Sequence, residues 1–318
     1  MAYKFLADEP VRAAIIRCGR EQLDRAITQL TEQINDDPGS AVHNARKAIK
    51  KERSLLRLAR GAMPSEQRRS ENATLRAAAR GLSNARDTEV MATTLEELSE
   101  RFAGQLPTTT FEAVREHLES RRQDATAVIG SAEAAAEQLG EIRRRVDDWE
   151  ISEQGWDAID VGLLRSYKRG RKALASARTT RSQEDLHAWR KRVKDLWYHE
   201  RLLAPTCGPT IRGQAKESHR LADLLGDDHD LGLLREKLTR DAVPVPVDVD
   251  AVVRLIDHRR GELQTEAILI GERVYAEPPK AFRRRMKRSW YAGRAAAQAP
   301  LEQHPAELAA ATREPQRS

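Results

Sequence analysis

The sequence lacks the features that mark secreted proteins, membrane-spanning proteins and proteins with a structural metal site. Its two cysteines, Cys18 and Cys207, fit neither a disulfide framework nor a metal-ligand spacing. No apolar run approaches the ~18 residues of a membrane span, and the first ten residues, MAYKFLADEP, lack the apolar stretch of a signal peptide. We therefore expect free thiols in a reducing compartment, the cytoplasm, and no membrane as a partner.

Aromatic residues are also scarce, at 4% of the chain, although hydrophobic residues reach 40%. Alanine and leucine must then build most of the core, which favours helices packed on helices. Apolar residues recur at helical spacing along nearly the whole chain, so the sequence predicts an all-α fold. The expected helices are 8–36, 41–61, 66–104 with a break near Gly81, 110–140, 157–179, 183–204, 210–240 with a break near Gly226, 249–276 and 279–298.

The chain repeats itself over a long distance. The segment AVHNARKAIKKERSLLRLA, residues 41–59, aligns without gaps on DLHAWRKRVKDLWYHERLL, residues 185–203, and residues 81–98 align on residues 224–238. A unit of this length is no solenoid repeat, so we interpret it as one helical bundle that has been duplicated. The predicted divisions are a first repeat 1–148, a linker 149–158, a second repeat 159–298 and a disordered tail 299–318.

Residues 43–60 carry basic side chains where a solvated helix face normally mixes charges of both signs, and Glu52 is the only acid among them. Like charges stand four residues apart, as in Arg46 with Lys50 and Arg53 with Arg57, and each such pair costs about 0.2–0.5 kcal/mol. A bound anion would relieve this repulsion. We therefore expect the basic face of this helix to bind an anion.

Four segments carry a basic stripe opposite an apolar one, and we expect the four stripes to face one groove that attracts a polyanion. Arginine can fork onto phosphate oxygens, whereas histidine among so many cations should be neutral at pH 7. Tyr198 and Tyr291 are the aromatic residues within these stripes. The candidate binding residues are His43, Arg46, Lys47, Lys50 and Arg57; Lys168, Arg171 and Lys172; His187, Arg190, Lys191, Lys194 and Arg201; and Lys280, Arg283, Arg284 and Lys287.

These segments resemble the CHAD family of α-helical domains marked by recurring histidines. The resemblance rests on VHNARKAIKKERSLLRL and LHAWRKRVKDLWYHERLL, each followed by its downstream segment, and it runs from about residue 3 to residue 297. It implies two four-helix bundles with long antiparallel helices, related by a pseudo-two-fold axis around a positively charged centre. It also implies binding of inorganic polyphosphate and recruitment to polyphosphate granules, through the candidate residues named above.

Two other functions stay open. The segment GDDHD, residues 226–230, places three acids around His229 and could bind a divalent cation in a phosphohydrolase. The matching first-half segment, NARD at 84–87, could not do so, and we favour helix capping or ion pairing at 226–230. Nonspecific nucleic-acid binding is the other alternative, because a basic groove attracts any phosphate backbone. We expect no catalysis, no cofactor and no metal, and the sequence indicates no particular protein partner.

Overall fold

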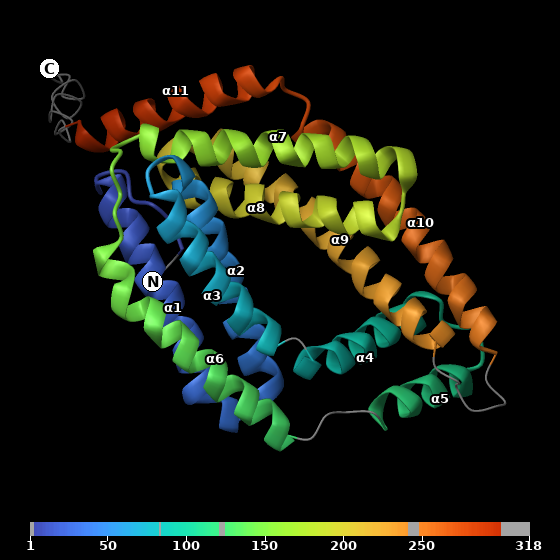
Figure 1. The fold of residues 1–318 in the computed structure, drawn as a ribbon. Coiled ribbons are helices and arrows are strands. Elements are labelled where there is room, and N and C mark those ends of the chain that lie inside the picture. Colours follow the sequence, from blue (N-terminus) through green and yellow to red (C-terminus); the bar gives the residue numbers. More distant parts are fainter. Residues whose placement is uncertain (1–2, 83, 121–124, 241–247, 300–318) are drawn as a thin grey trace, which may run out of the picture.

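The computed structural model describes residues 3–82, 84–120, 125–240 and 248–299, and every regular element within them is helical (Figure 1). The predicted all-α class is therefore confirmed. The described α-helices are α1 (Val11–Thr31), α2 (Pro38–Leu58), α3 (Ser65–Gly81), α4 (Asn84–Arg101), α5 (Thr108–Glu119), α6 (Ala125–Arg145), α7 (Asp157–Thr180), α8 (Gln183–Cys207), α9 (Pro209–Arg240), α10 (Val249–Val274) and α11 (Pro279–Gln298), and the short 3-10 helices are η1 (Gln33–Asn35), η2 (Ala59–Gly61) and η3 (Val146–Asp148). None of the described helices has the length and apolar character needed to cross a membrane.

Most of the expected helix boundaries agree with the structure, and two do not. The break near Gly81 lies where α3 ends and α4 begins. The single helix expected at 110–140 is two helices, α5 and α6. The break expected near Gly226 is wrong, because α9 continues through that glycine, against which the Arg190 side chain packs. A glycine inside a helix costs only about 1 kcal/mol, which packing offsets. The predicted tail lies outside the described residues from residue 300 onward.

The helices form two groups, which the chain joins where it passes from α6 to α7 and which meet again where α4 contacts α9 (Figure 1). In the first group α1 packs on α2 and α6, and α3 packs on α6. In the second group α8 packs on α7 and α9, α10 packs on α9, and α11 packs on α7 and α8. The pair of α4 and α5 leaves the first group and reaches the second, where α4 packs on α9. The candidate binding helices α2 and α8 therefore belong to different groups.

The main hydrophobic core extends through both groups. Trp149 and Trp156, which lie in the expected linker, are 0% and 1% exposed. Ser152 between them donates its backbone N–H and its hydroxyl to the carbonyl oxygen of Ala62, both at 2.9 Å. This connection is therefore packed against the core and holds the two groups together. A second, smaller core joins α4 and α5 to α9 and α10, with Leu95, Phe111, Leu234 and Ile256 among its members.

Glu52 of α2 is a carboxyl group inside the main core. It is 1% exposed, and neither of its side-chain oxygens has a hydrogen-bond partner among the described residues. Burial and, to a smaller extent, the charge of Glu71 raise the pKa of Glu52 from 4.5 to about 8. Glu71 is itself neutralised by Arg145, at 2.9 Å. Burying a charge without a partner is costly, so Glu52 is protonated in the folded protein at neutral pH.

We expect this carboxyl group to make stability depend on pH. Between pH 5 and pH 8 the folded protein keeps a proton that the unfolded chain has released, so the free energy of unfolding should fall as pH rises and level off above pH 8. The variant Glu52→Gln should reduce this fall by at least about 1.4 kcal/mol, the equivalent of one pKa unit. Urea denaturation at pH 5, 6.5 and 8 measures it. The exposed Glu66→Gln is the control, and equal pH profiles for the two variants would contradict the assignment.

Candidate functional site

Helices α2 and α8, which carry the two aligned stripes, cross near their carboxyl-terminal halves. The Ser54 hydroxyl donates to the carbonyl oxygen of Asp195 at 3.3 Å, and His199 Nε2 lies 2.9 Å from the carbonyl oxygen of Ser54. Arg57 pairs with the Asp195 carboxylate at 3.1 Å. From this crossing the amino-terminal halves of the two helices diverge (Figure 1). Their basic residues therefore border a space between the two groups of helices.

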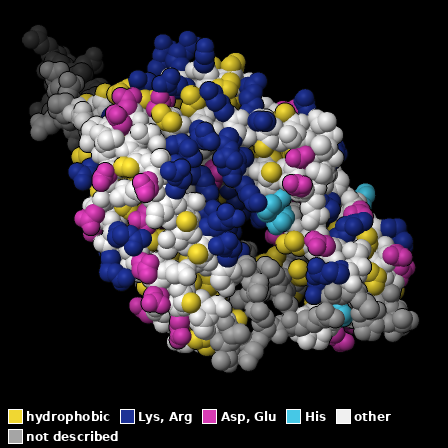
Figure 2. Space-filling model, in the orientation of Figure 1, with side chains coloured by type: hydrophobic (Ala, Val, Ile, Leu, Met, Phe, Trp, Pro, Cys, Tyr) yellow, Lys and Arg dark blue, Asp and Glu magenta, His cyan; other side chains and the backbone are white. Residues whose placement is uncertain are grey.

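Cationic side chains from α2, α3 and α8 face one another across this space. Burial lowers the pKa of Lys191, and the positive charges of Arg192, Arg53 and Arg76 lower it further. Burial likewise lowers the pKa of Arg53 to about 10, with added effects from Arg57, Arg76 and Arg192. Figure 2 shows a band of Lys and Arg side chains that runs into the hollow at the centre of the molecule. We call this set the central basic surface: Arg53, Arg57, Arg76, Arg190, Lys191, Arg192 and Lys194.

Two stacked histidines lie beside the central basic surface. The rings of His187 in α8 and His229 in α9 are stacked with centroids 4.1 Å apart. Burial lowers the pKa of His187 to about 4, and the charges of Lys191 and Arg190 contribute. Burial lowers the pKa of His229 to about 3, followed by the effect of Arg190. Both rings are neutral at pH 7, in line with the expectation from sequence, so they offer hydrogen bonds to a ligand and no charge.

Six arginines from five elements line a small pocket at one end of the central basic surface. The pocket has a volume of about 100 Å³, and no carboxylate is among its lining residues. On one side Gly162 of α7 lies against the α2 backbone, where a Cβ would be 2.0 Å from the carbonyl oxygen of Leu58. We call it the arginine pocket, and its arginines are Arg57, Arg60, Arg68, Arg165, Arg169 and Arg192.

Sequence reasoning found only Arg57 among these six. Arg165 and Arg169 are four residues apart on the α7 face that also carries Gly162 and Ser166, and those small residues were the available signal of close packing. Arg60 lies in η2 and Arg68 at the start of α3, so no helical stripe includes them. Only the packing of α7 against α2, η2 and α8, together with that of α3 against α2, brings the set together.

The other end of the space is lined by side chains of both signs. A pocket of about 520 Å³ there is lined by His43, Arg101, Arg259 and the acids Glu97, Asp227 and Asp230. Burial and, to a smaller extent, the charge of Glu97 raise the pKa of Asp227 to about 6. His43 is thus placed near acids. The potential becomes less positive from the arginine pocket toward this end.

The remaining candidates of α2 and α8 have several environments. Arg46 donates to the carbonyl oxygen of Leu82 at 2.7 Å, where a cation is favourable beside the carboxyl-terminal end of α3. Lys47 and Arg201 are exposed, and both depress the pKa of the buried Lys51, for which burial is the main cause. Lys50 is half-buried. Lys47 and Arg201 are therefore grouped around Lys51, whereas Arg46 faces the end of α3.

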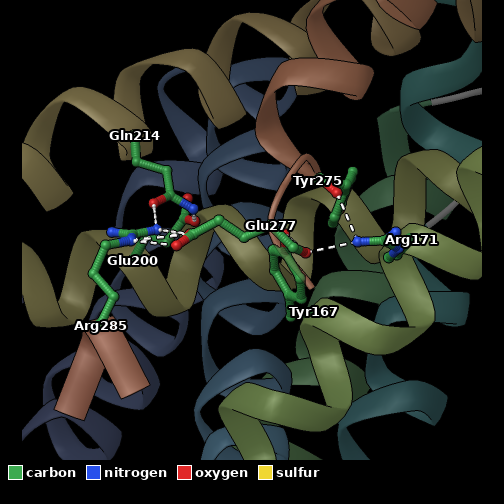
Figure 3. A network of polar contacts seen from close by, with 7 residues as sticks. All are labelled: Tyr167, Arg171, Glu200, Gln214, Tyr275, Glu277 and Arg285. Carbon is green, nitrogen blue, oxygen red and sulfur yellow. Dashed lines mark hydrogen bonds and ion pairs between the residues drawn. The ribbon is translucent and has the colours of Figure 1, made fainter. Parts of the chain in front are cut away.

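The α7 stripe expected from the sequence does not supply the arginine pocket. Arg171 donates to the carbonyl oxygens of Tyr275 and Glu277 at 3.2 and 2.6 Å, and so anchors the connection between α10 and α11 (Figure 3). Lys168 and Lys172 are exposed and are not among the residues that line the arginine pocket. The side of α7 that faces α2 presents Arg165 and Arg169 instead.

The fourth stripe lies apart from the central basic surface. Helix α11 buries Phe282, Met286 and Trp290 against α7 and α8 from outside, so its basic face points away from the centre (Figure 1). Arg283 pairs with Asp160 of α7 through both carboxylate oxygens. The expectation that all four stripes face one groove is therefore wrong for α11. Its basic residues border a shallow surface of their own: Lys280, Arg283, Arg284, Lys287 and Arg288.

The two tyrosines assigned to the stripes differ in exposure. Tyr291 is 51% exposed on α11, as expected. Tyr198 is buried, stacked on Trp197 with centroids 4.6 Å apart and edge-on to Tyr3, so its assignment to an exposed stripe is wrong. The tertiary contact with the amino-terminal segment covers it. An aromatic side chain for base stacking is therefore missing from this part of α8.

The residues of the GDDHD segment point in different directions around α9. Asp228 accepts hydrogen bonds from Arg260 at 3.0 Å and Gln264 at 2.8 Å, whereas Asp227 lines the 520 Å³ pocket and His229 stacks on His187. Helix capping is the wrong interpretation, because α9 is continuous here, and ion pairing is confirmed for Asp228. Within the described residues no group of three His, Cys, Asp or Glu could hold a metal ion. The side chains of 84–87 lie outside the described residues.

Comparison with known proteins identifies the family of this chain. A family model, the CHAD domain, matches residues 17–239, and no curated protein matches the chain. Among solved structures the chain resembles "PptA from Streptomyces chartreusis" with a TM-score of 0.52 and 13% sequence identity, over 85% of this chain and 100% of that one. At that identity the likeness concerns the fold. The matched residues include α2, α3, α7 and α8 and end before α11. The chain is a member of the CHAD domain family.

Proposed function

We propose that this protein binds inorganic polyphosphate on the central basic surface and does not cleave it. The observation that carries the proposal is the approach of like charges from α2, α3 and α8, each lowering the pKa of its neighbours. Such an arrangement is unfavourable without an anion, and a flexible chain with a charge on every phosphate can satisfy many cations at once. Arginine can donate two parallel hydrogen bonds to phosphate oxygens, and lysine attracts them as a point charge.

Polyphosphate fits this surface better than nucleic acid does. Single-stranded nucleic acids are held by aromatic side chains on which bases stack, in addition to basic grooves. Tyr198 is buried, and the exposed Tyr291 lies on α11, away from the central basic surface. The residues of the central basic surface are Arg and Lys, which suit phosphate oxygens, and no Trp, Tyr or Phe is among them to stack on bases.

Catalysis is the less favoured alternative. Hydrolysis of a phosphoanhydride needs charge stabilisation together with an activated water or a general base. The acids near the centre, Asp227 and Asp228, are directed away from each other and from the His187–His229 stack. Our proposal is therefore a binding protein without a cofactor. We also propose that it is located in the cytoplasm at polyphosphate granules.

We also infer that the two groups of helices descend from a duplicated four-helix bundle with a pseudo-two-fold relation. The supporting observation is that α2 and α8, the helices with aligned sequences, contact each other at equivalent carboxyl-terminal halves through Ser54 and Asp195. A two-fold relation brings equivalent elements together at its axis. The basic residues of both copies would then share one binding region, with repeats at 1–148 and 159–298.

Titration against long-chain polyphosphate and duplex DNA, at matched phosphate and at several salt concentrations, tests the proposed function. We expect polyphosphate to bind at least about tenfold more tightly than DNA at physiological salt, with affinity that falls as salt rises because counterions are released. Incubation with Mg²⁺ or Mn²⁺ should release no orthophosphate. Equal or tighter binding to DNA would overturn the choice of ligand, and release of orthophosphate would point to the phosphohydrolase.

A further inference from the structure

We propose that the arginine pocket is a subsite for a terminal phosphate group, so that the protein holds the end of a polyphosphate chain there and its interior phosphates on the central basic surface. The inference deepens the proposed function and rests on it for the identity of the chain. A single terminal phosphate on another small molecule shares the same chemistry, and the experiment below separates the two sources.

The charge balance of the pocket is the first support. Arg57 and Arg192 share the carboxylate of Asp195, at 3.1 and 3.2 Å. Arg60, Arg68, Arg165 and Arg169 form no ion pair with any other described residue; these four lie on η2, α3 and α7. Six guanidinium groups around one carboxylate leave a strong positive excess, which an anion with two or more charges would neutralise.

Arg68 provides a second and independent support. It is 9% exposed, and its buried Nε has no hydrogen-bond partner among the described residues. A buried donor left unpaired costs roughly 1–3 kcal/mol, and for a charged group the cost is higher. Since Arg68 lines the pocket, an anion bound there would accept a hydrogen bond from this guanidinium. Burial and the charges of neighbouring arginines also lower the pKa of Arg68.

The shape of the pocket favours a chain end over a chain interior. It holds about 100 Å³, one fifth of the 520 Å³ pocket at the other end of the space. Gly162 lies so close to the carbonyl oxygen of Leu58 that no ligand can pass between α7 and α2 at this point. A chain that enters from the central basic surface is therefore blocked on that side. A terminal phosphate fits a small site blocked on one side, whereas an interior phosphate needs an exit on each side.

The charge of a terminal phosphate suits the excess positive charge of the arginine pocket. An interior phosphate of the chain carries one negative charge, whereas a terminal group carries nearly two at neutral pH, because its second pKa is about 6 as in phosphate monoesters. Arginine remains fully protonated over this range. Recognition in the arginine pocket should therefore weaken as pH falls below about 6, and binding on the central basic surface should change less.

The test compares linear tripolyphosphate, which has two ends, with the six-phosphate ring hexametaphosphate, which has none. Isothermal titration at pH 7.5 is done with the wild type, with Arg165→Gln/Arg169→Gln and with Arg212→Gln/Lys216→Gln. The first pair is exposed in the pocket, and the second is exposed on α9 and removes the same charge at the same spacing. Long-chain polyphosphate and phosphoserine are titrated in parallel, and circular dichroism checks that each variant is folded.

We expect the pocket variant to lose at least about tenfold in affinity for tripolyphosphate and less than about threefold for the ring, with the α9 variant unchanged. Equal losses for both ligands, or equal losses in both variants, would overturn the subsite. If long chains do not bind but tripolyphosphate or phosphoserine does in a pocket-dependent way, the proposed function fails and a site for small phosphate compounds stands. If long chains bind and the pocket variant loses no more affinity for tripolyphosphate than for the ring, the proposed function stands and the terminal-phosphate subsite fails.

Discussion

Reversing two charges across the central basic surface should abolish most polyphosphate binding. Lys191 of α8 and Arg76 of α3 are exposed and face each other, with Arg76 among the causes of the lowered pKa of Lys191. The variant Arg76→Glu/Lys191→Glu replaces two attractive charges with two repulsive ones at the place where the helices converge. We expect its Kd for long-chain polyphosphate to rise at least about 100-fold, and the slope of log K against log salt to fall by about two, one for each lost phosphate contact.

The matched control carries the same change in charge on another surface. Arg212→Glu/Lys216→Glu alters two exposed residues of α9 that lie outside the central basic surface and the arginine pocket. This variant should bind within about threefold of the wild type, because exposed charges further apart than ~8 Å are screened at physiological salt. Equal weakening of the two variants would mean that net charge attracts the ligand, and the convergence of α3 and α8 would then have no part in binding.

Removing the indole of Trp189 should cost about 3–5 kcal/mol of stability. Trp189 lies on α8 opposite the basic residues and is fully buried. It occupies the space left by Gly271 of α10, where a Cβ would lie 2.4 Å from the indole ring, and Leu174 of α7 borders the same space. The variant Trp189→Ala would leave a cavity between three helices that cannot close without moving α10. Urea denaturation followed by circular dichroism measures the loss.

Tyr291→Ala is the comparison for that variant. Tyr291 is an aromatic residue on the surface of α11, where its ring contacts Lys287, and its removal should change the free energy of unfolding by less than about 0.5 kcal/mol. Under conditions in which Trp189→Ala is folded, it should still bind polyphosphate, because Arg190 and Lys191 lie on the other side of α8 and remain in place. A loss below about 1 kcal/mol for Trp189→Ala would show that the Trp189 side of α8 does not face the core.

Local sequence patterns were reliable wherever one helix decides the outcome. The apolar spacing of α8 predicted that Trp189 is buried, and the basic spacing predicted that Lys191 faces solvent. The same reasoning placed Tyr198 in the exposed stripe, and it failed there because Tyr3, nearly 200 residues away, covers that part of α8. The expected break at Gly226 failed for a similar reason, since packing against α8 supports α9 through the glycine.

The composition and the 3.6-residue period by themselves determined the all-α class, the buried side of each helix, and the two aligned basic segments that suggested a polyanion. Only the tertiary structure decided which basic faces meet: α2, α3 and α8 converge, α7 contributes Arg165 and Arg169, and α11 turns its charges outward. The physical reason is that helical periodicity records each side chain's angle about its own axis, whereas the meeting of faces depends on contacts between helices far apart in the sequence.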